Sequence, residues 1–314
     1  MLREKPLLTI VVPVFNEEKC LDALFSRLCG LRERMAGETH IEFLFVNDGS
    51  RDRTAEILDT LAKECPFVKV VALSRNFGHQ IAVTAGIDHS KGEWVALIDA
   101  DLQDPPEALF EMFRLAQEGY DVVYGVRKSR RGETFLKQFT AASFYRILRY
   151  LCEIDIPRDT GDFRIISRRV ADALCSMREH HRFIRGMVPW VGYKSIGHYY
   201  DRDERYAGET KYPLSKMLHF AVNAILSFSS KPLALATRFG IMTVVLGILG
   251  AAYMLYLKLF TDIPVPGITA VIVTIVIFGG AQILLTGLVG EYVARIFEEA
   301  KRRPLYVVAE TRNL

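Results

Sequence analysis

The sequence predicts an α/β domain with a mostly parallel, Rossmann-like sheet and helices on both faces, followed by two helices that can span a membrane. Three observations support this prediction. Short apolar runs alternate with segments of helical periodicity over residues 1–213, which is the pattern of a doubly wound sheet. Polar clusters follow these runs, where open α/β sheets bind ligands. Two long apolar segments lie within residues 238–292.

The elements of the first domain are expected in a regular order. Apolar and β-branched runs predict five strands, at residues 7–14, 41–46, 68–73, 94–98 and 121–124. Helical periodicity predicts helices that end near Met35 and Lys63, and Thr54 helps to cap the second of these. After the fourth strand, Pro105-Pro106 can open the next helix.

The segment Asp99-Ala-Asp101-Leu-Gln103 directly follows the fourth strand. If the chain stays extended there, the side chains of Asp99, Asp101 and Gln103 point the same way, because side chains alternate along an extended chain. Carboxylate and amide oxygens suit Mg²⁺ or Mn²⁺ better than a soft metal. We therefore expect a divalent-cation site at the carboxyl end of the sheet. The alternative is a solvated acidic turn.

The two apolar runs, residues 239–257 and 268–289, are each long enough to cross a bilayer as a helix. Basic residues lie outside both runs, whereas the connecting loop 258–267 has only one Lys and one Asp. The positive-inside rule then predicts a multi-pass protein whose first domain and both termini are cytoplasmic. The alternative is a helical hairpin buried in a soluble protein.

Three further segments flank these elements. Residues 214–237 are expected to form amphipathic juxtamembrane helices, and residues 135–151 form either an interfacial helix or an ordinary helix on the sheet. Residues 293–314 are expected to be a cytoplasmic tail, with a short strand at 304–309. That strand could return to its own sheet or pair with a neighbour's, which would make a homo-oligomer.

Composition excludes some classes of function. The net charge of +3 gives no electrostatic basis for nucleic acid binding. The five cysteines are odd in number and form no C-x-x-C pair, which is typical of reduced thiols in a cytosolic compartment. No signal-peptide pattern precedes the first strand.

Four motifs occur in order: Pro13-Val-Phe-Asn-Glu-Glu18, Val46-Asn-Asp-Gly-Ser50, Asp99-Ala-Asp101 and Thr160-Gly-Asp-Phe-Arg164. Together they resemble the family 2 glycosyltransferases with a GT-A fold, and most of all the branch that glycosylates polyprenyl phosphates. That branch includes bactoprenol glucosyltransferases and dolichol-phosphate mannose synthases, and the two C-terminal spans are similar to the bactoprenol type. The resemblance covers nearly the whole chain. Asn47 departs from it, because many relatives carry Asp there.

The resemblance implies a nucleotide-sugar donor and assigns residues to it. The residues that would hold the base and ribose are Pro13, Phe15, Glu17 and Asp48. Asp99, Asp101 and Gln103 match the motif for the metal and the diphosphate, and Arg127 matches a basic residue near the diphosphate. The segment Arg185-Gly-Met-Val-Pro-Trp190 lacks the Gln-x-x-Arg-Trp signature of processive synthases, which favours transfer of a single sugar.

The resemblance also implies an acceptor site. Asp162 matches the carboxylate assigned as catalytic base. We expect the acceptor phosphate to be held by Arg164, Arg205, Lys211 and Tyr212. A lipid phosphate is largely dianionic at neutral pH, with a second pKa of about 6, so it scarcely needs deprotonation. Asp162 is therefore expected either to orient the acceptor or to take a residual proton. His79 could equally contact the donor or cap the next helix.

The resulting hypothesis is a metal-dependent hexosyltransferase of the bacterial inner membrane. It would move glucose from UDP-glucose to undecaprenyl phosphate, with inversion, for cell-envelope modification. GDP-mannose or an amino-sugar nucleotide is the alternative donor, and a diacylglycerol hydroxyl is an alternative acceptor. A membrane scaffold that binds nucleotide sugar without catalysis is the alternative from another class. Retention of Asp99, Asp101 and Asp162 disfavours it.

Overall fold

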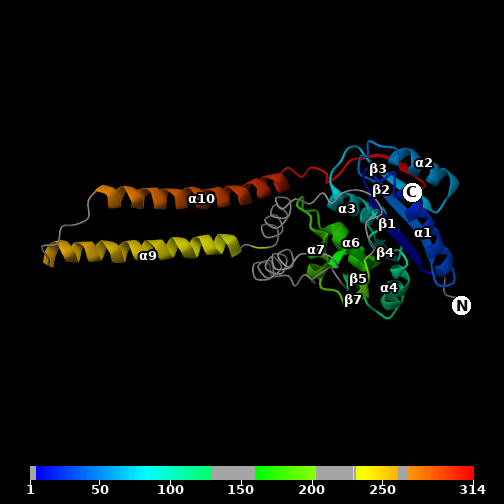
Figure 1. Ribbon diagram of the computed structural model, residues 1–314, viewed down its shortest axis with the longest axis horizontal. Coiled ribbons are helices and arrows are strands. Elements are labelled where there is room, and N and C mark those ends of the chain that lie inside the picture. The colour runs from blue at the N-terminus through cyan, green and yellow to red at the C-terminus, as the bar shows by residue number, and fades with distance from the viewer. Residues whose placement is uncertain (1–4, 129–159, 203–228, 230, 261–267) are drawn as a thin grey trace. The chain divides into compact units, whose positions relative to one another are not determined.

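The computed structural model describes residues 5–128, 160–202, 229, 231–260 and 268–314 (Figure 1). The chain divides into two units. The first contains the sheet, its helices and residues 304–314, and the second contains two long helices. The predicted positions 135–151, Arg205, Lys211 and Tyr212, and most of 214–237, lie outside the described residues.

The first unit is built on an eight-stranded sheet of order β7-β5-β6-β4-β1-β2-β3-β8. The strands are β1 (Leu7–Val14), β2 (His40–Asn47), β3 (Val68–Leu73), β4 (Trp94–Leu97), β5 (Val122–Arg127), β6 (Thr160–Ser167), β7 (Ser195–Tyr200) and β8 (Val308–Arg312). β4, β1, β2 and β3 pair in parallel, as do β5 and β7, whereas β6 and β8 pair antiparallel with their neighbours. The predicted mostly parallel sheet is therefore confirmed.

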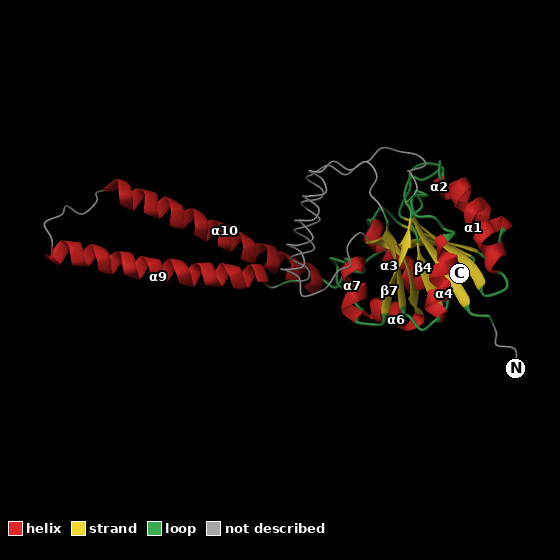
Figure 2. Cartoon of the chain, turned by 60° about the horizontal axis from the view of Figure 1, so that its bottom comes forward, coloured by secondary structure: helices red, strands yellow, loops and turns green. Residues whose placement is uncertain are grey.

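Helices cover both faces of this sheet (Figure 2). They are α1 (Leu21–Met35), α2 (Thr54–Glu64), α3 (His79–His89), α4 (Ala108–Gln117), α6 (Arg168–Ser176) and α7 (Ile184–Val191). Apolar side chains of α1, α2 and α4 share one buried cluster with Ile10, Phe43 and Phe45. α3 packs on the other face, where Gly86 meets Val11 of β1. The parallel strands are thus buried on both sides, which accounts for their nearly continuous apolar sequences.

The close approach of α3 to the sheet gives a stability prediction. A Cβ added at Gly86 would collide with Cγ1 of Val11 and lie 3.2 Å from Cγ2 of Val46. Overpacking of this kind costs about 1–3 kcal/mol, and Val side chains are stiff at χ1. We expect Gly86→Ala to lower the melting temperature of the full chain in detergent.

Gly30 in α1 is the matched control, because a Cβ there meets nothing within 4 Å. Gly30→Ala should raise the melting temperature, since Ala favours a helix by about 0.5–1 kcal/mol over Gly. Equal shifts in the two variants would contradict the packing argument.

Two strands and one turn differ from the sequence-based expectation. β6 carries Asp162 and Arg164, and these two charges mask its apolar pattern. β7 is an edge strand of mixed polarity. After β4 the chain does not stay extended, because Leu102 takes a left-handed conformation with φ 60° and Asp101 Oδ1 accepts the backbone N–H of Gln103 at 3.1 Å. The alternation argument for residues 99–103 was therefore wrong.

The C-terminal tail returns to its own sheet. β8 pairs antiparallel with β3, and the side chain of Asn313 donates to the carbonyl oxygens of Ala62 and Val68 at 2.6 and 2.9 Å. The expected strand exists, four residues further along the chain than predicted. Of the two alternatives for this strand, the structure shows pairing within the chain.

The second unit consists of α9 (Lys231–Phe260) and α10 (Ile268–Ala300), which run side by side (Figures 1 and 2). By length and composition, Lys231–Leu257 and Thr274–Ala300 can each cross a membrane. Their large aliphatic side chains, such as Ile283 and Leu284, are exposed. An apolar surface of this extent is typical of a helix that contacts lipid or a partner.

Candidate active site

Three loops at the carboxyl ends of β1, β2 and β3 are joined by hydrogen bonds. Asn16 accepts the backbone N–H of Arg51 at 2.8 Å, and the N–H of Glu17 donates to Thr54 at 3.0 Å. Asp48 accepts the backbone N–H groups of Phe77 and Gly78 at 2.7 and 2.9 Å. Burial raises the pKa of Asp48, and these two hydrogen bonds oppose that shift. These hydrogen bonds hold the three loops together at the carboxyl ends of the strands.

The end of β1 and the loops after β1 and β2 contain the residues predicted to hold the donor's base and ribose. Phe15 is exposed at the end of β1, Glu17 follows it, and Pro13 is buried within the strand. Both carboxylate oxygens of Asp48 accept hydrogen bonds from the main chain, so this side chain fixes the loop after β3. Contact of these four residues with a nucleotide stays a prediction.

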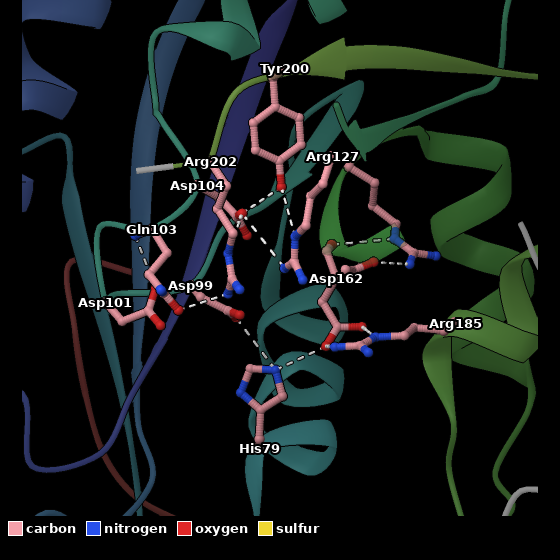
Figure 3. A network of polar contacts seen from close by, with 12 residues as sticks. His79, Asp99, Asp101, Gln103, Asp104, Arg127, Asp162, Arg185, Tyr200 and Arg202 are labelled. Carbon is pink, nitrogen blue, oxygen red and sulfur yellow. Dashed lines mark hydrogen bonds and ion pairs between the residues drawn. The ribbon is translucent and has the colours of Figure 1, made fainter. Parts of the chain in front are cut away.

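Asp162 lies at the centre of a polar network (Figure 3). It is on β6, only 2% exposed. Arg185 of α7 donates to both of its carboxylate oxygens at 3.0 Å, and the side chains of His79 and Gln80 contact Oδ2 at 3.2 Å each. Burial works in the opposite direction, but Arg185 and His79 hold the pKa of Asp162 well below its ordinary value.

His79 links Asp162 to the segment after β4. It is the first residue of α3, and its Nε2 lies 3.2 Å from Asp162 Oδ2 and 3.5 Å from Asp99 Oδ1. Although burial lowers it, the carboxylates of Asp99 and Asp162 raise the pKa of His79 to about 9. The imidazole therefore bears a positive charge between two carboxylates at neutral pH.

A second network surrounds the buried carboxylate of Asp104. Asp104 accepts the hydroxyl of Tyr200 and lies 3.7 Å from Arg127 Nη2 and 3.8 Å from Arg202 Nε. Arg202 also donates to the side-chain oxygen of Gln103 at 2.7 Å. Burial and the Asp104 carboxylate raise the pKa of Tyr200, so the phenol keeps its proton. Two guanidinium groups are thereby held beside the turn that contains Asp101 and Gln103 (Figure 3).

Arg164 has a different environment from the one predicted. It is buried and donates to the carbonyl oxygens of Gly161 at 2.8 Å and Asp162 at 3.3 Å. Burial lowers the pKa of Arg164 to about 10. A side chain bound to the main chain behind Asp162 is placed to support β6. This geometry argues against the predicted direct contact with an acceptor phosphate.

The carboxylate and amide oxygens of the Asp99–Gln103 turn are of the kind that bind a divalent cation such as Mg²⁺. Partial burial raises the pKa of Asp99, and the carboxylates of Asp162, Asp104 and Asp101 raise it further, although His79 opposes this. A cation would relieve that repulsion. Within the described part of the chain, no three His, Cys, Asp or Glu side chains surround one metal position. Mg²⁺ commonly uses one or two carboxylates together with water and substrate phosphates.

Apart from Arg127, which was predicted to lie near the diphosphate, sequence reasoning assigned few of the residues that surround Asp162 and Asp104. Gln80 and Arg185 had no assigned role, and Asp104, Tyr200 and Arg202 were not singled out. Gln80 and Arg185 stand 82 and 23 residues from Asp162, so no periodicity could bring them together. For His79 the sequence left two alternatives open, contact with the donor or capping of the next helix, and the structure places its side chain between Asp99 and Asp162.

Comparison with known proteins defines the class. The model of glycosyl transferase family 2 matches residues 9–175, and the chain belongs to this family. The chain is 50% identical over 303 residues to the uncharacterized glycosyltransferase YkcC of Bacillus subtilis, covering 96% of this chain and 93% of the relative. It is 36% identical over 301 residues to the bactoprenol glucosyl transferase of Shigella phage SfV, covering 96% and 97% of the two chains.

A solved structure supports the fold. Mannosyl-3-phosphoglycerate synthase from Rubrobacter xylanophilus aligns with a TM-score of 0.50 and 16% identity, over 74% of this chain and 75% of that chain. Together with the family match, this confirms the predicted GT-A type of sheet.

Proposed function

We propose that this protein transfers one hexose, with inversion, from a nucleotide sugar to a polyprenyl phosphate at the cytoplasmic face of a bacterial membrane. One observation carries the proposal. The Asp99–Gln103 turn contacts two basic networks, through Arg202 from the Asp104 network and through His79 from the Asp162 network. Such a site can hold two phosphate-bearing substrates on either side of one reacting carbon. The relatives named bactoprenol glucosyl transferase support the polyprenyl acceptor.

The donor side is assigned to the turn and the Asp104 network. Asp99, Asp101 and Gln103 would hold Mg²⁺ or Mn²⁺, which when bound neutralises charge on the departing nucleoside diphosphate. Arg127 and Arg202 add two planar guanidinium groups, which match phosphate oxygens well. Asp104 and Tyr200 hold these arginines in place. UDP-glucose is the proposed donor, and GDP-mannose or an amino-sugar nucleotide is the alternative.

The bond changes need no strong base. An oxygen of the acceptor phosphate attacks the anomeric carbon. The bond from that carbon to the diphosphate breaks, and its electron pair leaves with the nucleoside diphosphate. The products are the glycosylated lipid phosphate and the nucleoside diphosphate, with the anomeric centre inverted. Because the attacking phosphate is largely dianionic, with a pKa of about 6, and the pKa of Asp162 is lowered, we assign Asp162 an orienting role.

The second unit is assigned to the membrane. α9 and α10 would cross the bilayer, with only the loop at residues 258–267 outside, and with the sheet domain, including its C-terminal strand β8, in the cytoplasm. Basic residues at the ends of the two helices away from this loop, among them Lys231 at the start of α9 and Arg303 just after α10, support this orientation. A polyprenyl acceptor lies in the same bilayer, so a membrane anchor would keep the enzyme close to its substrate.

The direct test uses the full chain in detergent, with undecaprenyl phosphate, Mn²⁺ or Mg²⁺, and radiolabelled nucleotide sugars. We expect label from one donor to enter the organic phase, and removal of the metal by EDTA to abolish it. Restoration of transfer by added Mn²⁺ would show that the chelator did not inactivate the protein. Absence of lipid label from every donor would reject the proposal and favour the scaffold or another acceptor.

A further inference from the structure

In the network around Asp162, the Arg185 guanidinium and the His79 imidazole are more exposed than the carboxylate that they contact. Asp162 is 2% exposed, whereas the side chains of Arg185 and His79 are 30% and 43% exposed. The labelled side chains in Figure 3 show Arg185 and His79 approaching Asp162 from different elements. A molecule that enters from solvent therefore meets the guanidinium and the imidazole before it meets the carboxylate.

Asp162 is poorly suited to touch a phosphate itself. Its carboxylate already accepts from Arg185, His79 and Gln80, and it carries the same sign of charge as a phosphate dianion. At 4 Å two like charges repel by about 4 kcal/mol in an environment of effective dielectric constant near 20. The contact would be unfavourable unless a cation stood between them. Arg185 is such a cation, because its guanidinium donates to both carboxylate oxygens of Asp162 at 3.0 Å.

Arg185 is also held from behind. The backbone N–H of Ile184 donates to Gln80 Oε1 at 2.9 Å, and Gln80 Nε2 donates to Asp162. Gln80 thus ties the start of α7, where Arg185 lies, to the same carboxylate that Arg185 contacts. A guanidinium fixed in this way loses less side-chain freedom when it binds a planar or tetrahedral oxyanion.

We propose that Arg185 binds the phosphate monoester of the acceptor, and that Asp162 and Gln80 are positioning residues that hold it. This inference rests on the proposed function and names the ligand of its acceptor side. The donor diphosphate is the competing partner. We assign it to Arg127 and Arg202 instead, because Arg202 contacts Gln103 of the turn whereas Arg185 contacts Asp162.

The test measures binding of farnesyl phosphate and of farnesol to the full chain in detergent, beside donor binding and sugar transfer. Arg185→Gln removes the positive charge, and Arg185→Lys keeps the charge but removes the planar guanidinium that can donate two parallel hydrogen bonds. Arg178→Gln is the matched control, because Arg178 also pairs with an aspartate of low side-chain exposure, Asp88, at 2.7 Å but lies outside the site. Melting temperatures are recorded for each variant.

We expect Arg185→Gln to weaken binding of farnesyl phosphate by about 10- to 100-fold, the range for a charged hydrogen bond, with farnesol binding and donor affinity unchanged. Arg185→Lys should be intermediate, and Arg178→Gln should match the wild type. If Arg185→Gln does not fold, Arg185→Lys decides the question.

Loss of donor affinity with unchanged farnesyl phosphate binding would overturn the inference and assign Arg185 to the leaving group. Wild-type protein that binds both farnesyl compounds equally would also overturn it. The proposed function is tested separately, by sugar transfer. Phosphate-selective binding through Arg185 without sugar transfer would reject that function alone, and transfer that ignores Arg185 would reject this inference alone.

Discussion

Replacing Asp162 by asparagine is expected to lower kcat by about 100- to 1000-fold, the range seen when one preorganised transition-state contact is removed, with little change in donor affinity. The amide cannot accept the fork of Arg185 and the side chains of His79 and Gln80 together. Arg185 and His79 then lose the carboxylate that holds them. Steady-state transfer kinetics and calorimetric donor binding check this result.

Stability must be separated from catalysis in this variant, because breaking a buried ion pair costs about 3–5 kcal/mol. Asp121→Asn is the matched control. Asp121 is likewise buried and paired with an arginine, Arg169, but it precedes β5 at the opposite end from the site. It should lower the melting temperature without a comparable fall in kcat. If Asp162→Asn instead abolished donor binding, Asp162 would be a donor ligand.

A double-mutant cycle would show whether Asp162 acts through Arg185. Residues in one network couple, whereas independent effects add within about 0.5 kcal/mol. We expect Asp162→Asn with Arg185→Gln to bind farnesyl phosphate no more weakly than Arg185→Gln alone. Additive losses would mean that the two side chains act separately.

Replacing Asp101 by asparagine is expected to abolish metal-dependent transfer and to remove the effect of Mn²⁺ on donor affinity. Asp101 supplies one of two carboxylates in the turn, and Mg²⁺ or Mn²⁺ held by one or two carboxylates depends strongly on each. The measurement is calorimetric binding of the nucleotide sugar with and without Mn²⁺. This measurement reports on metal-dependent donor binding independently of turnover.

Glu107→Gln is the control for Asp101→Asn. Glu107 follows the same turn, but its carboxylate pairs with Arg27 on the surface. It should keep both transfer and the effect of Mn²⁺. Equal dependence of donor binding on Mn²⁺ in the wild type and in Asp101→Asn would contradict the assignment of the metal to this turn.

The parallel part of the fold could be predicted from sequence because its strands are buried on both faces. β1 and β2 contain no charged residue except Glu42, so their apolar runs stand out. β6 was seen only as a motif, because Asp162 and Arg164 interrupt its apolar run. The turn after β4 was mispredicted because a left-handed residue such as Leu102 has no sequence signal.

The sequence by itself determined which chemical groups gather at the carboxyl ends of the strands. Asp48 and Asp99 come just after apolar runs, so they could be named as site residues without coordinates, whereas Asp162 was named only through the family motif Thr160-Gly-Asp-Phe-Arg164. Only the tertiary structure decided what each carboxylate contacts. Asp48 binds the main chain, Asp104 holds two arginines, and Asp162 holds Arg185. The longest of these contacts joins residues 98 positions apart, Asp104 and Arg202, and the geometry of the contacts depends on how α3, α7 and β7 pack on the sheet.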